Sequence, residues 1–271
     1  MDEYRQANHE LWNEWADIHV ESELYNVEAF KEGKNSLNTL ELEEVGDVAG
    51  KTLLHLQCHF GKDTLSWARL GAEVTGADFS ERAIGHARRL SEEIGVPATF
   101  VCSDLYALPD ALQGQYDIVF TSYGAISWLS DIRGWARVVN HFLKPGGLFY
   151  IAEFHPTAYC FENRDVPGDT TLQLQYPYFY SPTPLRFETK GSYAAPDSDF
   201  QGIEYNWSHP LSDIVSALTE VGLRIEFLHE FPFSVDGSMF AGMEKGEDGY
   251  WRLKGQAIEL PLMFSIRARK E

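Results

Sequence analysis

Between Lys51 and Phe154, short apolar runs alternate with stretches of helical spacing. Such alternation is typical of successive strand–helix units on a parallel sheet. The sequence therefore predicts an α/β core with helices on both faces of the sheet. Strands are expected at residues 51–57, 72–78, 98–103, 116–122 and 147–154, and helices at about 62–70, 80–93 and 131–142.

The chain before this core is expected to be helical. Helical spacing at 4–19 groups Leu11, Trp12 and Trp15 on one side, and 36–45 predicts a second helix. We therefore define an N-terminal helical segment, residues 1–50, that either packs on the core or forms a lid over it. The core itself is taken as residues 51–155.

The chain after the core changes character twice. Residues 156–209 are rich in proline and aromatic side chains, and two alternating stretches, 171–180 and 185–193, predict antiparallel strands. We expect this part to be a small β-rich insertion on the substrate side. Residues 210–271 then return to the core pattern and are expected to complete its sheet, with a helix at 211–221 and strands at 223–231 and 258–268.

The charge of the chain disfavours two classes of partner. Its 41 acidic and 22 basic side chains give a net charge of -19, which repels a phosphate backbone or an anionic membrane surface. No apolar run approaches the roughly 20 residues needed to span a bilayer. The first residues are polar and acidic rather than basic and then apolar, and the three cysteines (Cys58, Cys102 and Cys160) are far apart. We expect a cytoplasmic protein, either a monomer or a homodimer.

Polar and glycine-containing segments follow the predicted strands. The first strand runs into the turn QCHFG at 57–61, the second ends in Asp78, and the third is followed by Asp104. Ligands of open α/β sheets bind at the carboxyl ends of the strands, where an acidic side chain can meet the hydroxyls of a ribose. The spacing therefore predicts a pocket for a cofactor that contains a nucleoside.

This series, together with YDIVFTS at 116–122 and the LKPGG hairpin at 143–147, resembles the class I S-adenosylmethionine-dependent methyltransferases. The resemblance covers roughly residues 51–154. It implies a Rossmann-like seven-stranded sheet whose last strand is antiparallel, and S-adenosylmethionine as the cofactor. The family usually has an acid followed by glycines at alternate positions, whereas this chain has His55, Gln57 and His59 there and keeps only Gly61. The variant LHLQCHFG is similar to that of a subgroup of uncharacterised bacterial small-molecule methyltransferases.

The resemblance also implies roles for individual residues. The turn from Gln57 through Cys58 and His59 to Gly61 would lie under the methionine part of the cofactor. Asp78 would bind the ribose hydroxyls, and Asp104 would accept a hydrogen bond from the adenine amino group. The remaining residues expected to contribute to the cofactor site are Phe79 and Ser80 beside the adenosine, Leu105 through its backbone N–H, and Ser122 and Tyr123 near the sulfonium and the acceptor.

Two histidines are candidate general bases. His155 and His209 both fall on the carboxyl side of the predicted sheet, where an imidazole could take a proton from an acceptor at neutral pH. A loop histidine that binds backbone is the alternative for each, and Glu153 is the next candidate. No metal site is expected, because His55, Cys58 and His59 crowd one turn without a fourth ligand nearby.

The predicted function is methyl transfer to a small-molecule acceptor, with the acceptor atom (oxygen, nitrogen or sulfur) left open. A non-catalytic binding protein of the same fold is the first alternative, since two glycines of the motif are replaced. A nicotinamide-dependent oxidoreductase is the second, although no G-x-G-x-x-G follows the first strand. The acidic surface favours a neutral or cationic acceptor.

Overall fold

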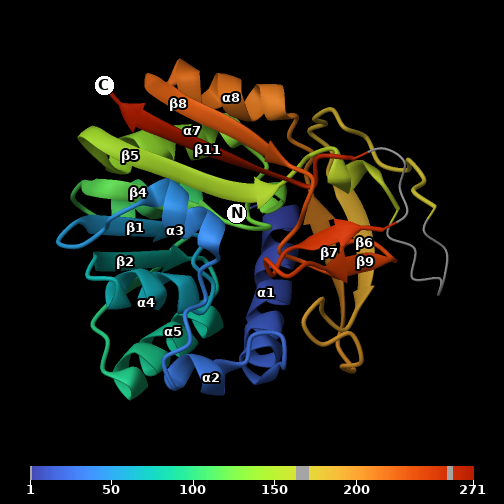
Figure 1. Ribbon diagram of the computed structural model, residues 1–271, viewed down its shortest axis with the longest axis horizontal. Coiled ribbons are helices and arrows are strands. Elements are labelled where there is room, and N and C mark those ends of the chain that lie inside the picture. The colour runs from blue at the N-terminus through green and yellow to red at the C-terminus, as the bar shows by residue number, and fades with distance from the viewer. Residues whose placement is uncertain (1, 163–170, 255–258) are drawn as a thin grey trace.

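The computed structural model describes residues 2–162, 171–254 and 259–271. Its centre is a seven-stranded sheet with the strand order β3-β2-β1-β4-β5-β11-β8 (Figure 1). The strands of this sheet are β1 (Thr52–Leu56), β2 (Glu73–Asp78), β3 (Thr99–Cys102), β4 (Tyr116–Ser122), β5 (Leu143–Phe154), β8 (Leu223–Phe231) and β11 (Met263–Lys270).

β1 to β5 pair in parallel, and β11 pairs antiparallel with its two neighbours. β1 is central, and Leu53 lies opposite Val74 of β2 and Ile118 of β4 in parallel register. β11 runs antiparallel between β5 and β8. The predicted Rossmann-like sheet with an antiparallel last strand is therefore confirmed, and the carboxyl ends of β1 to β4 meet at one edge.

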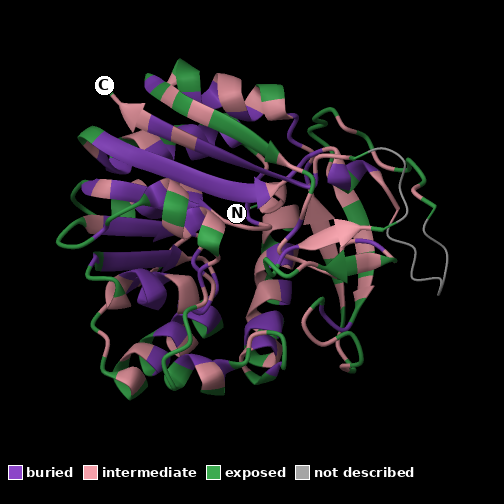
Figure 2. Ribbon diagram, in the orientation of Figure 1, coloured by how far each residue is buried: buried purple, intermediate pink, exposed green. Residues whose placement is uncertain are grey.

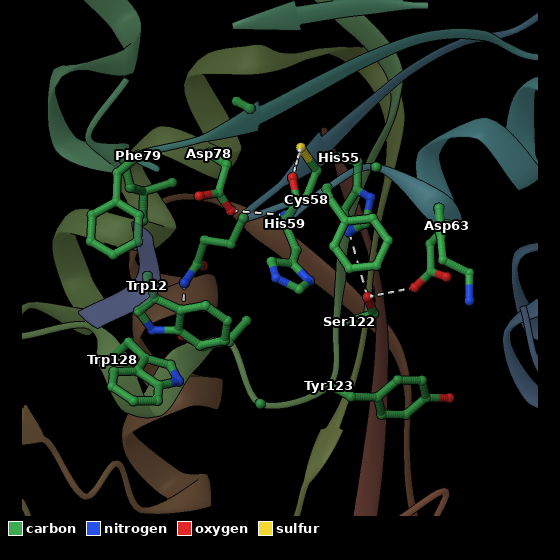
Figure 3. A pocket seen from close by; sticks show the side chains of 18 of the residues that line it. Trp12, His55, Cys58, His59, Asp63, Asp78, Phe79, Ser122, Tyr123 and Trp128 are labelled. Carbon is green, nitrogen blue, oxygen red and sulfur yellow. Dashed lines mark hydrogen bonds between the residues drawn. The ribbon is translucent and has the colours of Figure 1, made fainter. Parts of the chain in front are cut away.

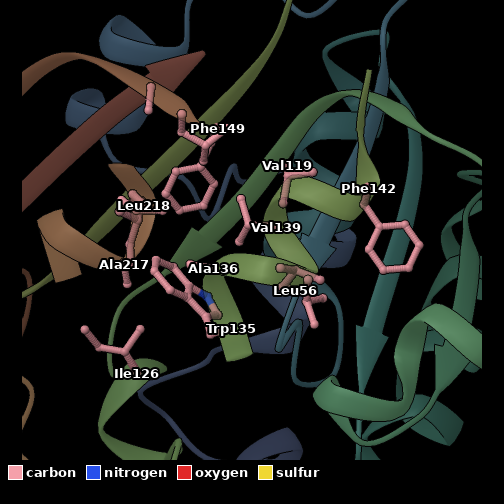
Figure 4. Close-up of a cluster of buried hydrophobic side chains, with 14 of the residues drawn as sticks. Leu56, Val119, Ile126, Trp135, Ala136, Val139, Phe142, Phe149, Ala217 and Leu218 are labelled. Carbon is pink, nitrogen blue, oxygen red and sulfur yellow. The ribbon is translucent and has the colours of Figure 1, made fainter. Parts of the chain in front are cut away.

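Helices cover both faces because successive side chains of each strand point to opposite sides. Leu53 packs in one apolar cluster with Trp67 of α4 (Lys62–Arg69), whereas Leu54 packs in another with Trp135 of α7 (Ile132–Phe142). α8 (Leu211–Glu220) joins the second cluster, shown in Figure 4. The central strands are buried on both faces (Figure 2).

Helix α5 (Glu81–Ile94) shows how local sequence sets the element boundaries. The Ser80 side chain accepts a hydrogen bond of 3.0 Å from the Ala83 N–H, and the helix ends where Gly95 takes a left-handed conformation. These are the usual N-cap and C-cap residues. Ser80 is thereby buried as a helix cap.

The N-terminal segment forms α1 (Glu3–Glu21), α2 (Val27–Lys31) and α3 (Thr39–Val45). Helix α1 stands between the core sheet and the small sheets in Figure 1. Its Asn8 side chain donates to the Tyr205 carbonyl at 2.7 Å and accepts from the Tyr205 N–H at 2.8 Å. On the other side, Arg82 of α5 pairs with Asp17 of α1 at 2.8 Å. One helix therefore connects the insertion to the core.

The insertion contains one of the two predicted strands. Residues 185–193 give β6 (Leu185–Lys190), which pairs with β7 (Gln201–Asn206) in an antiparallel hairpin. The prediction of a strand at 171–180 is wrong: there only Leu174 forms an isolated bridge, with Phe161. Pro177 lacks the N–H that a strand ladder needs. Residues 163–170 of the predicted insertion lie outside the described residues.

A second small hairpin, β9 (Met243–Lys245) with β10 (Trp251–Leu253), lies in the C-terminal part and was not predicted. The predicted strand at 258–268 begins later, as β11, and residue 258 is outside the described residues. The LKPGG residues form the start of β5. The remaining short elements are η1 (Leu105–Ala107), α6 (Leu108–Ala111), η2 (Ile126–Trp128) and η3 (Ala158–Cys160).

Candidate active site

A cavity of about 390 Å³ opens where the carboxyl ends of β1, β2 and β4 meet (Figure 3). Its floor is the turn at 57–61, and Asp78 and Ser122 end the strands on either side. Helix α1 contributes Arg5, Asn8 and Trp12 to the opposite wall. The cavity thus lies between the sheet edge and the N-terminal segment.

The turn at 57–61 keeps a left-handed backbone where glycines are replaced. Gln57 has φ of 56° and His59 has φ of 52°, and Gly61 follows at 80°. Side chains other than glycine adopt this region rarely, at a cost of roughly 1–2 kcal/mol per residue. At Gly61 a Cβ atom would also be crowded, because it would lie 2.7 Å from the Phe100 ring, which would have to shift. The motif therefore retains glycine where a Cβ atom would collide with Phe100.

Hydrogen bonds hold the strained turn in place. The Gln57 side-chain amide donates to the Ala125 carbonyl at 2.7 Å. The Cys58 N–H donates to the Ala77 carbonyl at 3.0 Å, and the His59 N–H donates to the Asp78 carboxylate at 2.8 Å. Each of these bonds connects the turn to a neighbouring strand or loop, which explains how the chain tolerates two non-glycine residues there.

The His59 side chain connects the turn to helix α1 of the N-terminal segment. Its Nε2 lies 3.2 Å from Nδ1 of His19 in α1, and Trp12 and Tyr25 pack against its ring at centroid distances of 5.4 and 5.3 Å. Burial lowers the pKa of His59 and His19, that of His19 to about 3. Both histidines are therefore neutral at physiological pH. The His59 side chain, at a position where the family usually has glycine, packs against α1.

Asp78 ends β2 and presents its carboxylate to the cavity. Its two carboxylate oxygens accept backbone N–H bonds from His59 at 2.8 Å and Ser80 at 2.9 Å. Burial raises the pKa of Asp78 to about 6, against the opposite effect of these hydrogen bonds. The carboxylate is ionised at pH 7 and lines the cavity beside Phe79.

Asp104 lies in the same cavity and already has partners. It accepts from the Tyr106 N–H at 2.9 Å and from the Arg5 guanidinium at 3.2 Å. Leu105 and Tyr106 line the cavity beside it. Arg5 therefore closes this end of the cavity with a charged contact from α1.

A second group of polar side chains lies at the end of β4. Ser122 Oγ lies 3.4 Å from both the Asp63 carboxylate and Nε2 of His55, and Asp63 accepts from Ser36 Oγ at 2.6 Å. Burial raises the pKa of Asp63 and lowers that of His55 to about 3. The histidine at the family's acidic position is thus neutral, and Asp63 supplies a carboxylate to this part of the cavity.

Tyr123 connects the cavity to a buried acid. Its hydroxyl donates to the Glu41 carboxylate of α3 at 2.6 Å, and the same carboxylate accepts from the Asn38 N–H at 2.7 Å. Glu41 is 1% exposed, and burial raises its pKa to about 7. A carboxylate of this kind can take a proton near neutral pH.

Most of the residues expected at the cofactor site line this one cavity. They are Gln57, Cys58, His59, Gly61, Asp78, Phe79, Asp104, Leu105, Ser122 and Tyr123. Ser80, the helix cap, is not among the lining residues. The two candidate bases also lie elsewhere: His155 pairs with Glu230 at 2.9 Å, and His209 bonds the Leu129 carbonyl at 2.7 Å.

Glu153 serves the site through the backbone. Its buried carboxylate accepts N–H bonds from Ala125 at 2.7 Å and Ile126 at 3.1 Å, and also from Gly124 and Phe154. These bonds fix the loop after β4, which carries the carbonyl that holds Gln57. Glu153 therefore positions the loop rather than facing the acceptor.

Sequence reasoning missed several lining residues, among them Arg5, Asn8, Asp63, Trp128 and Val235. Arg5 and Asn8 stand seven and four positions before Trp12, so all three share one helix face. Their shared helix face could have indicated from the sequence that they line one site. The sequence around Val235 and Trp128 gives no such indication, because loops far apart in the chain bring these two residues to the cavity.

Cysteine and metal chemistry find no support in the described ranges. Cys58 is 3% exposed, and burial raises the pKa of its thiol, so it is a packing residue. The described residues contain no group of three or more potential metal ligands. They also contain no helix that is long and apolar enough to cross a membrane.

Comparison with known proteins agrees with this architecture. The methyltransferase-domain family matches residues 53–147. A ubiquinone biosynthesis O-methyltransferase of Bordetella avium is 27% identical over 192 residues, which cover 67% of this chain and 78% of that protein. An uncharacterised methyltransferase of Synechocystis is 33% identical over 125 residues, 45% of this chain and 56% of that protein.

Solved structures show the same fold. An S-adenosylmethionine-dependent methyltransferase of Mesorhizobium loti matches with a TM-score of 0.59 and 20% identity, covering 89% of this chain and all of that one (100%). The glycopeptide N-methyltransferase MtfA, complexed with S-adenosylmethionine, matches with a TM-score of 0.53 and 20% identity, covering 84% and 90%. With the sheet order and the matched domain, these findings define a methyltransferase. The chain carries a methyltransferase domain at residues 53–147 and has the fold of the class I S-adenosylmethionine-dependent methyltransferases.

Proposed function

We propose that this methyltransferase acts on a small-molecule acceptor, which it meets in the cavity at the carboxyl edge of the sheet. The observation that carries the proposal is the enclosure of Asp78, the left-handed turn and the end of β4 in one cavity of about 390 Å³. Because α1 covers this cavity, it suits a compact acceptor better than a large macromolecular surface. The net charge of -19 further disfavours nucleic acid.

The residues present fit S-adenosylmethionine. Asp78 accepts N–H bonds from His59 and Ser80, and a carboxylate has about four lone-pair sites, so acceptor capacity remains for the ribose hydroxyls. Gln57 Oε1 is buried without a hydrogen-bond partner in the described part of the chain, in the turn proposed to lie under the methionine part. Asp104 and Leu105 are proposed to recognise the adenine, with Arg5 beside them.

Bound at this site, the cofactor supplies an electrophilic methyl group for an in-line displacement. The protein's part in such a reaction is to align the reactants and to exclude water. Trp12 and Trp128 pack edge to face at a centroid distance of 5.2 Å on the lid side of the cavity, where they keep water out. Ser122 and Tyr123 are proposed to face the acceptor.

Tyr123 and Glu41 provide a route for the acceptor's proton. An acceptor hydroxyl can donate to Tyr123 Oη while the phenol passes its own proton to Glu41 across 2.6 Å. Tyr123 lines the main cavity, whereas His155 and His209 do not, so the proton is proposed to leave through Tyr123 to Glu41 behind it. An oxygen acceptor is the first class to test, because several relatives are named O-methyltransferases.

Calorimetric titration with S-adenosylhomocysteine, followed by a screen of small acceptors for its production from S-adenosylmethionine, tests the proposal. We expect micromolar binding, about -8 kcal/mol, and turnover with at least one hydroxylated acceptor. Tyr123→Phe should then lower kcat for that acceptor while leaving the affinity for S-adenosylhomocysteine unchanged. Absence of binding, or turnover on proteins alone, contradicts the proposal.

A further inference from the structure

Asp63 presents its carboxylate to the main cavity without an ion-pair partner among the described residues. It stands at the start of α4, directly after the turn at 57–61. The neighbouring Lys62 Nζ donates to the Tyr25 carbonyl and lies over the Tyr25 ring instead. Burial raises the pKa of Asp63, because a carboxylate that leaves bulk water without a cation loses hydration that nothing fully replaces. A cation bound in the cavity would balance this charge.

One of the two carboxylate oxygens of Asp63 has acceptor capacity left for a ligand. Oδ1 accepts from Ser36 Oγ at 2.6 Å. Among the described residues, Oδ2 accepts only a long bond of 3.4 Å from Ser122 Oγ. The side chain is half-buried and lines the cavity, so this oxygen is not sealed inside the core. Because a carboxylate has about four lone-pair sites, Oδ2 can accept from a ligand donor as well.

The side chains around Asp63 supply no cation of their own. His55 Nε2 lies 3.4 Å from Ser122 Oγ, but burial lowers the pKa of His55 to about 3, so its ring is neutral. The Tyr123 hydroxyl donates to Glu41 and not to Asp63. A metal ion needs several ligands, and the described residues contain no group of three or more potential metal ligands. The surroundings of Asp63 therefore suit an organic cation that donates hydrogen bonds.

The position of Asp63 relative to Asp78 indicates which cation this is. The two carboxylates lie on opposite sides of the turn at 57–61 (Figure 3). The proposed cofactor site has the ribose at Asp78 and the methionine part over the turn. A cofactor that lies in this direction brings its amino-acid end, with its ammonium group, toward Asp63.

We propose that Asp63 Oδ2 binds the α-ammonium group of the methionine part of the cofactor. An ammonium group carries a positive charge and three N–H donors, which are what this carboxylate lacks. The charge thus comes from α4 rather than from β1, where the family usually has an acid and this chain has the neutral His55. The inference rests on the proposed cofactor site and adds to it a residue that determines specificity for the amino-acid end.

Two ligands that differ only in the ammonium group test this assignment. They are S-adenosylhomocysteine and its desamino analogue, in which a hydrogen atom replaces the α-ammonium group. In calorimetric titrations of the full chain, S-adenosylhomocysteine should bind at least about tenfold more tightly, as expected for a hydrogen bond between charged groups. Equal affinities overturn the role of Asp63 and leave the cofactor site standing. Failure of both ligands to bind overturns the proposed cofactor site and this assignment with it.

Asp63→Asn locates the effect, because it removes the charge and keeps an oxygen for Ser36 Oγ. It should weaken binding of S-adenosylhomocysteine at least about tenfold and leave binding of the desamino analogue unchanged. Retained binding of the analogue also shows that the variant is folded. Asp110→Asn, at an exposed position of α6, removes the same charge outside the cavity and should change neither affinity. Equal losses for both ligands in Asp63→Asn overturn the proposal.

A role of Asp63 toward the acceptor gives a different result. If Asp63 bound an amine of the acceptor, Asp63→Asn would leave the affinity for S-adenosylhomocysteine at the wild-type value. The same variant would then raise KM for the acceptor alone. That outcome overturns the assignment to the cofactor, and it leaves the proposed methyl transfer to a small molecule in place.

Discussion

The carboxylate of Asp78 accepts a hydrogen bond of 2.8 Å from the backbone N–H of His59. This bond joins the end of β2 to the turn after β1, so one side chain both shapes the floor of the cavity and presents charge to it. Structural and binding roles of Asp78 are thereby coupled. A test of its binding role needs a variant that preserves the turn.

Asp78→Asn is such a variant, because its one amide oxygen can still accept from the His59 N–H of the turn, while the bond from the Ser80 N–H is lost. We expect it to weaken S-adenosylhomocysteine binding by at least tenfold, since one charged acceptor for the ribose hydroxyls is lost. Calorimetry measures the affinity, and chemical denaturation checks that the fold is retained. Unchanged affinity in a folded Asp78→Asn protein would exclude Asp78 from the cofactor site.

The same carboxylate predicts a pH dependence. Burial raises the pKa of Asp78 to about 6, so the group is ionised above that pH and protonated below it. Because the ionised form is the better acceptor, affinity for S-adenosylhomocysteine should rise with pH through about 6 and then level off. Titrations between pH 5 and 8 measure the curve, and Asp78→Asn should flatten it.

The core sheet and most of the cavity floor could be predicted because they depend on sequence patterns within short segments. Strand periodicity located β1 to β5, and strand ends that meet at one edge brought Asp78, Asp104 and Ser122 to one cavity. The positive φ values of Gln57 and His59 follow the glycine pattern of the motif even though the glycines are gone. Backbone geometry is retained there by contacts made elsewhere in the fold.

The rest depends on contacts between distant segments. Nothing near His209 in the sequence shows that it bonds Leu129, and nothing near Asn8 shows its pair of bonds to Tyr205. β7 was not predicted because apolar and polar residues alternate only weakly over 201–206. These residues form a strand because they pair in antiparallel register with β6. The alternation at 171–180 was misleading, since it comes from aromatic side chains in an irregular segment.

The strained turn predicts an unusual preference between glycine and alanine. Gln57→Gly and Gln57→Ala both lose the bond to Ala125, but only alanine retains a Cβ at positive φ. The alanine variant should be less stable by about 1 kcal/mol. At Glu92, an exposed position of α5, the order should reverse by about 1 kcal/mol. Urea denaturation measures both pairs, and the same order at both sites would contradict the strain at Gln57.

Gly61 and Gly95 separate backbone strain from steric exclusion. Both have positive φ, 80° and 65°, but a Cβ at Gly61 would lie 2.7 Å from Phe100 while one at Gly95 meets nothing within 4 Å. Gly95→Ala should therefore cost about 1 kcal/mol, and Gly61→Ala about 1–3 kcal/mol more through overpacking. Equal losses in the free energy of unfolding would show that Phe100 moves aside readily.

Glu41 predicts how stability changes with pH. Burial raises its pKa from 4.5 to about 7, so between those values the folded protein binds more protons than the unfolded chain. Stability contributed by the protonated acid is therefore fully present below about pH 4.5 and is lost as the pH rises through about 7. Glu41→Gln keeps one oxygen for the Asn38 N–H, and its NH₂ can donate to the Tyr123 hydroxyl oxygen in place of the bond that the carboxylate accepts. The difference between wild type and Glu41→Gln in the free energy of unfolding should shift against wild type by about 1–3 kcal/mol from pH 5 to pH 8. Both proteins contain Asp63 and Asp78, so the titration of these two acids cancels in the difference. A difference that stays constant with pH would mean that Glu41 ionises normally and is unsuited to take the acceptor's proton.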